Sequence, residues 1–118
     1  MTKLEEFKAS VRMVGKTAVI DLHGEIDNFA DSALNDAYDH AEARDPGAIS
    51  LNFTDVVYIN STGIALIVGL LARARQSHRQ LLTFGLSDHY QEIFRITRLS
   101  DFMGMHEDES SALAAVAE

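Results

Sequence analysis

DVVYINSTGIALIVGLL, residues 55–71, is the stretch that decides how this chain folds. It predicts a loop up to Asn60, followed by a helix with Ser61 and Thr62 at its N-terminus. No charge occurs from Thr62 to Ala72, so we expect this helix to be apolar nearly all round and the most buried of the molecule. The run is too short to cross a bilayer, which takes roughly 20 apolar residues. Its N-terminus favours negative charge, because the first N–H groups are unpaired and the helix dipole is positive there.

Strands and helices alternate on both sides of this stretch. Period-two alternation predicts strands at 7–13 and 49–53, and short runs rich in apolar residues predict strands at 17–22, 81–86 and 102–105. Gly15-Lys16 forms the turn of an N-terminal hairpin. Helical spacing predicts further helices after Asp27 or Asn28, after Ser87 or Asp88, and after Asp108. The first of these is expected to turn one face inward: Phe29, Ala30, Ala33, Leu34, Ala37, Tyr38 and Ala41. The order predicts one α/β domain, with a mixed sheet of four to five strands packed by about four helices.

Composition excludes several classes of function. The 118 residues are 47% hydrophobic and 24% charged, which is typical of a globular domain. A net charge of −8 disfavours direct binding to nucleic acid or to an anionic membrane. There is no cysteine, and the five histidines lack the spacing of a metal site. Residues 1–6 contain no apolar segment of a signal peptide, so we expect a cytoplasmic chain without membrane insertion.

Motifs for catalysis or cofactor binding are also missing. The glycines form neither a P-loop nor a dinucleotide fingerprint. Ser61 is not in a nucleophile elbow, because Ile59 occupies the place of that motif's first glycine. We therefore expect no enzyme, no metal and no cofactor.

Four short motifs follow one another along the chain: Gly24-Glu25-Ile26-Asp27, the strand 49–53 leading through Asp55, Asn60-Ser61-Thr62-Gly63, and Phe84-Gly85-Leu86. Their order and spacing resemble the STAS domain, a family named for sulfate transporters and anti-sigma factor antagonists. The resemblance implies a single STAS-like domain over residues 1–118, with its core at about 7–116.

The resemblance also implies a function and a site. In bacterial anti-sigma factor antagonists, an anti-sigma factor with serine kinase activity phosphorylates the serine two residues before the glycine, here Ser61. The family's aspartate after the second strand corresponds to Asp27. Asn60 departs from the usual aspartate, which either eases phosphorylation by reducing repulsion or weakens recognition by the kinase. We predict that the partner contacts Asp27, Tyr58, Asn60, Ser61 and Thr62.

Simpler roles stand beside these predictions. Ser61 and Thr62 are good helix caps, and Asp27 is one as well. Tyr58 and Ile59 are either exposed for a partner or cover the edge of the sheet. Two other functions fit the resemblance: a structural STAS subunit of a larger signalling assembly, and an accessory STAS subunit of a lipid or anion transporter. A homodimer and an assembly of several STAS domains are both compatible with the sequence.

Overall fold

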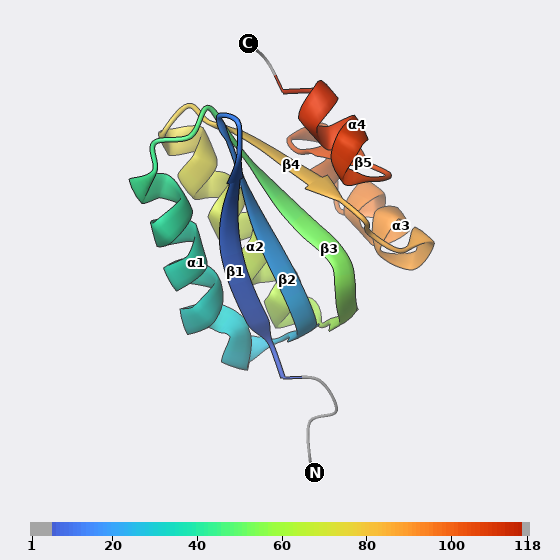
Figure 1. The fold of residues 1–118 in the computed structure, drawn as a ribbon. Helices are drawn as coiled ribbons and strands as arrows, with labels where there is room; N and C mark the ends of the chain where they lie inside the picture. The colour runs from blue at the N-terminus through green and yellow to red at the C-terminus, as the bar shows by residue number, and fades with distance from the viewer. Residues whose placement is uncertain (1–5, 117–118) are drawn as a thin grey trace.

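A five-stranded sheet in the order β1-β2-β3-β4-β5 forms the centre of the computed structural model, which describes residues 6–116 (Figure 1). The strands are β1 (Lys8–Val14), β2 (Thr17–Ile26), β3 (Ala48–Ile59), β4 (Gln80–Phe84) and β5 (Gly104–His106). β1 is antiparallel to β2, and every other neighbouring pair is parallel. The predicted hairpin and mixed sheet are confirmed. The expectation about a signal segment and the ends of the predicted domain concern residues 1–5 and 117–118, which lie outside the described range.

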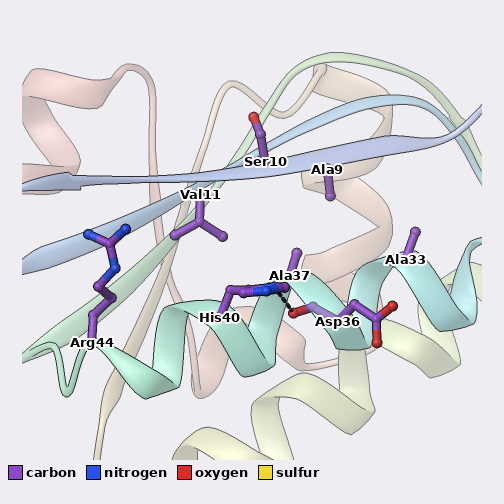
Figure 2. Close-up of a pocket in the computed structure, with 8 residues that line it drawn as sticks. All are labelled: Ala9, Ser10, Val11, Ala33, Asp36, Ala37, His40 and Arg44. Atoms are coloured by element: carbon purple, nitrogen blue, oxygen red, sulfur yellow. Dashed lines mark hydrogen bonds between the residues drawn. The ribbon is translucent and has the colours of Figure 1, made fainter.

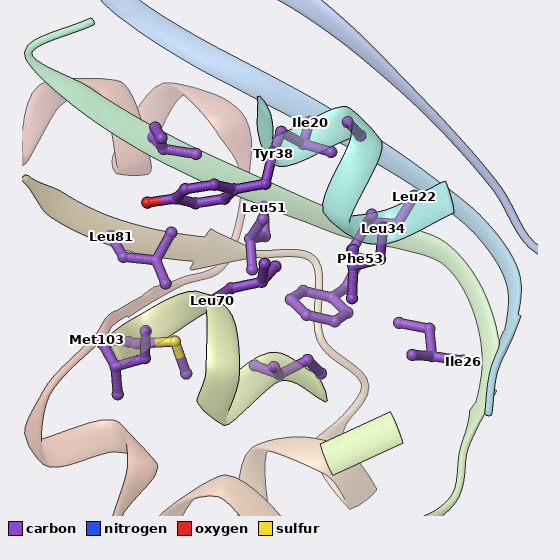
Figure 3. Close-up of a cluster of buried hydrophobic side chains, with 14 of the residues drawn as sticks. Ile20, Leu22, Ile26, Leu34, Tyr38, Leu51, Phe53, Leu70, Leu81 and Met103 are labelled. Atoms are coloured by element: carbon purple, nitrogen blue, oxygen red, sulfur yellow. The ribbon is translucent and has the colours of Figure 1, made fainter. Parts of the chain in front are cut away.

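Helices cover both faces of the sheet. They are α1 (Asp31–Ala43), α2 (Ser61–Gln76), α3 (Asp88–Ile96) and α4 (Glu109–Ala114), with single 3₁₀ turns η1 (Asn28–Ala30) and η2 (Leu99–Asp101). The main core lies between the sheet and α1 and α2, where Leu34 and Leu70 meet Leu22 and Phe53 (Figure 3). On the opposite face of the sheet, Ala112 of α4 packs near Val19 and Phe84.

β2 and β3 are longer than the sequence pattern predicted. They pair in parallel as far as Ile26 and Ile59, with register shifts after Asp21 and Gly24. The prediction of a loop from Asp55 is therefore wrong. β4 pairs with β3 only up to Asn52, so the last part of β3 has β2 as its single neighbour and exposes most of its side chains. An exposed strand loses the alternation by which strands are detected in sequence.

α2 is buried on one face only. Its buried residues are Gly63, Ile67, Leu70, Leu71 and Ala74, whereas Ala65, Val68, Gly69 and Ala72 are exposed. α2 is apolar nearly all round, but it does not bury all of that surface, because the helix lies in an outer layer with one side toward water. The inward position predicted for Phe29 is also wrong. It lies in η1, before the periodicity of α1 begins, and is 76% exposed. No helix within residues 6–116 is long and apolar enough to cross a membrane.

Candidate functional site

The predicted site residues meet at the carboxyl ends of β2 and β3. Ile26 pairs with Ile59, and the N–H of Asn60 donates to the carbonyl oxygen of Ile26 at 3.2 Å. Paired strands lie about 4.8 Å apart, so the residues that follow them leave the sheet side by side. Asp27 therefore emerges next to the start of α2, which carries Ser61.

Asn60 caps α2. Its backbone is extended, and its side-chain Oδ1 accepts a hydrogen bond from the N–H of Gly63 at 2.8 Å. Ser61 and Thr62 are the first two residues of the helix. Both are exposed, and their hydroxyls make no hydrogen bond with any residue from 6 to 116. The prediction that Ser61 or Thr62 caps the helix is wrong, because the cap must precede the first helical residue and asparagine is among the best caps.

Gly63 allows the helix to start against the sheet. A Cβ atom at this residue would lie 2.1 Å from the carbonyl oxygen of Ile26 and 2.9 Å from Cγ2 of Ile59. Only glycine permits this approach. The glycine of the Asn60-Ser61-Thr62-Gly63 motif thus fixes the start of α2, and with it Ser61, against the end of β2.

Tyr90 holds the same junction from α3. The backbone N–H of Ile59 donates to Oη of Tyr90 at 2.8 Å, in a buried position. Helical spacing in α3 places Tyr90 beside the buried Phe94 and gives no sign of this hydrogen bond. A hydrogen bond across 31 positions leaves no signal in local periodicity.

Tyr58 and Ile59 have opposite environments. Tyr58 is 50% exposed at the end of β3, whereas Ile59 is 5% exposed and belongs to the core. Val57 is exposed as well, although the sequence pattern did not single it out. The side chains of Val57 and Tyr58 therefore both face water just before Ser61.

Asp27 caps the 3₁₀ turn η1. Its Oδ1 accepts a hydrogen bond from the N–H of Phe29 at 2.9 Å. The capping role predicted for Asp27 is confirmed. A contact between Asp27 and a partner stays a prediction.

A separate hollow of about 410 Å³ lies between β1 and α1 (Figure 2). His40 lines it, with Nδ1 placed 2.8 Å from the carbonyl oxygen of Asp36, and Arg44 closes one side. No residue of the predicted site lines this hollow. Within residues 6–116, no group of three or more side chains is arranged to hold a metal ion.

Comparison with known proteins defines the class to which this fold and site belong. The family described as "Mlab, STAS domain" matches residues 9–106, so the chain belongs to the STAS domain family.

Among known proteins, the chain is similar to the anti-sigma-B factor antagonist of Listeria monocytogenes, with 34% identity over 80 residues, 68% of this chain and 70% of the relative. Solved structures share the fold. An anti-sigma factor antagonist from Mycobacterium paratuberculosis superposes with a TM-score of 0.83 at 18% identity, covering 96% of both chains. The phosphorylated form of the Bacillus cell fate determinant SpoIIAA gives 0.70 at 22% identity, covering 92% of this chain and 99% of the other.

Proposed function

We propose that this protein is an anti-sigma factor antagonist of the cytoplasm. It binds an anti-sigma factor with serine kinase activity through the surface formed by Asp27, Tyr58, Asn60, Ser61 and Thr62, and so frees a sigma factor. Phosphorylation of Ser61 ends this binding. The names of the curated relatives support the class of partner.

The observation that carries the proposal is the state of the Ser61 hydroxyl. It is exposed at the first position of α2, and the cap of this helix is provided by Asn60, not by Ser61. Modification of Ser61 therefore breaks no hydrogen bond within the described chain. A phosphate at this place lies at a helix N-terminus, which favours an anion.

The same phosphate would lower the affinity of this surface for a partner. It adds roughly −1.5 to −2 charges and three acceptor oxygens. At a close-packed interface, desolvation and like-charge repulsion then cost several kcal/mol. Each 1.4 kcal/mol is about a tenfold change in affinity, so a few kcal/mol release the partner without unfolding the domain.

The proposal is tested by affinity purification of the tagged protein from its native cells, with mass spectrometry of the bound proteins and of Ser61. Wild type and Ser61→Ala are expected to retain an anti-sigma factor, and Ser61→Asp is expected to lose it. Ser110→Asp is the matched control, because it adds the same charge at an exposed residue of α4.

Equal recovery of the partner by Ser61→Ala and Ser61→Asp, with no phosphate on Ser61 after incubation with kinase and ATP, would exclude the switch. Recovery of an ATPase or a membrane protein in place of an anti-sigma factor would favour the accessory transporter subunit. A megadalton particle in size-exclusion chromatography would favour the structural subunit.

A further inference from the structure

A groove of about 500 Å³ lies between the second half of α2 and the segment that follows α3. Leu71 and Leu99 line it as buried residues, whereas Val68 and Phe102 line it with 44% and 55% of their surfaces exposed. Single exposed apolar residues are ordinary, but several around one groove mark a place of interaction. None of the residues predicted to contact the anti-sigma factor lines this groove.

A second hollow of about 420 Å³ extends the groove along the end of α2. It shares Leu71, Arg75 and Phe102 with the first and continues to Gln80 and Gly104, where β4 and β5 begin. The two hollows together form one elongated trough, which we call the α2 trough. Its lining runs from Val68 along α2 to Gln80 at the start of β4, which suits an extended occupant. Apolar grooves of this kind typically receive the apolar face of an amphipathic helix.

The rim of the α2 trough is positively charged, although the chain has a net charge of −8. Arg75 lies 5.1 Å from the ring centre of Phe102 and makes no ion pair with any residue from 6 to 116. Arg98 pairs with Asp101 at 2.6 Å and has a largely exposed side chain. By contrast, Arg73 on the other side of α2 is paired with two carboxylates of α1. The α2 trough therefore offers an unpaired guanidinium beside apolar side chains.

We propose that the α2 trough binds an acidic amphipathic helix of a partner protein. Aliphatic side chains of that helix, spaced at i, i+3 or i+4 and i+7, enter the trough, and Asp or Glu residues beside them face Arg75 and Arg98. The overall charge of the chain repels an acidic partner at long range, so the preference must come from the trough itself. The proposal does not depend on phosphorylation of Ser61.

Two synthetic helical peptides of about four turns test the proposal. They share one Leu-based apolar stripe and differ only in having Glu or Lys beside it. Binding to the full chain is followed by fluorescence anisotropy, and the site is located by amide chemical shifts in NMR. We expect the Glu peptide to bind at least about tenfold more tightly than the Lys peptide, with the largest shifts at Val68, Ala72 and Phe102.

Variants of the protein then distinguish the effect of charge within the α2 trough from the effect of the overall charge of the chain. Arg75→Glu is expected to weaken binding of the Glu peptide by about tenfold or more, and Val68→Ser to weaken both peptides. Arg44→Glu is the matched control, since it makes the same change of charge at an exposed residue outside the trough and should have less than about a twofold effect. Val68, Arg75 and Arg44 are all exposed, so these variants are expected to fold.

Four results would overturn the proposal. The first is equal or tighter binding of the Lys peptide, and the second is an equal loss with Arg75→Glu and Arg44→Glu. The third is self-association of the chain that Val68→Ser abolishes, because a second copy would then occupy the α2 trough. Absence of binding by either peptide at about millimolar concentration, the weak end of specific affinities, also counts against it.

Discussion

Asn60 and Ser61 are neighbours with different roles: Asn60 caps α2, and Ser61 is the proposed phosphorylation site. Their contributions to stability can therefore be measured separately. Asn60 pairs with the N–H of Gly63, whereas the Ser61 hydroxyl has no partner in the described chain. We expect Asn60→Ala to lower the free energy of unfolding by about 1 kcal/mol, the usual value of a lost cap. Ser61→Ala should change it by less than about 0.5 kcal/mol, as at other exposed sites. Urea denaturation of both variants provides the measurement, and equal losses would show that Ser61 shares the cap.

Two glycines of α2 should respond in opposite directions to alanine. At Gly63 a Cβ atom would collide with the backbone of Ile26, so we expect Gly63→Ala to destabilise the fold by about 1–3 kcal/mol, as overpacking does. At Gly69 a Cβ atom would meet open space, and Gly69→Ala should stabilise the helix by about 0.5–1 kcal/mol. Thermal unfolding distinguishes the two. Stabilisation by both substitutions would mean that the start of α2 can move away from β2.

The hydroxyl groups of two tyrosines, Tyr90 and Tyr38, should also respond differently to removal. Oη of Tyr90 accepts the buried N–H of Ile59, so Tyr90→Phe leaves that donor unpaired and should cost about 1–3 kcal/mol. The hydroxyl of Tyr38 is buried without a hydrogen-bond partner among residues 6–116. Tyr38→Phe should therefore be neutral or slightly stabilising. Denaturant unfolding of the two variants checks this, and a large loss in Tyr38→Phe would reveal a partner for that hydroxyl.

Among the elements, α4 is held to the far face of the sheet by charge as well as by packing. Arg12 of β1 hydrogen-bonds to Asp21 of β2 and to Glu109 of α4. The hydrogen bond from Arg12 lowers the pKa of Glu109 below its ordinary value of 4.5. Burial raises the pKa of Asp21, but hydrogen bonds from Arg12 and Asn52 outweigh it, and the net shift is downward from 3.8.

Attachment of α4 should therefore weaken in acid. Carboxylates with lowered pKa values in the folded state stabilise it above their ordinary pKa values, and this contribution is lost as the pH falls below about 4.5. Because the side chains are partly exposed, we expect less than about 1 kcal/mol. NMR signals of α4 should move toward unfolded positions in this range before those of β3. At pH 7, Glu109→Gln should reproduce part of the effect and Glu107→Gln none of it; an unchanged α4 in Glu109→Gln would assign the attachment to packing alone.

At the scale of the whole molecule, the order of elements was predictable because each carries a local signal. Alternating, apolar and helical patterns placed all five strands and all four helices, and the motif around Ser61 marked the start of α2. What could not be predicted depends on contacts between distant residues. The extension of β3 to Ile59 is supported by pairing with β2, and the environment of Tyr90 is set by a strand 31 positions away. The exposure of Val68 depends on how α2 lies on the sheet. The residues of α2 alone do not determine this orientation, because it also depends on the strands and helices against which α2 packs.

Three distant segments meet at the first turn of α2: the end of β2 through Gly63, the end of β3 through Asn60, and α3 through Tyr90. The shape around Ser61 thus exists only when all three are assembled. Under the proposed switch, a kinase that recognises this shape would act on native molecules and ignore nascent or damaged chains. We expect the intact domain to be phosphorylated far faster than a synthetic peptide of residues 55–66, as initial rates with the same kinase would measure. Under the proposed switch, only the folded molecules of this protein would then become phosphorylated at Ser61 and contribute to the signal.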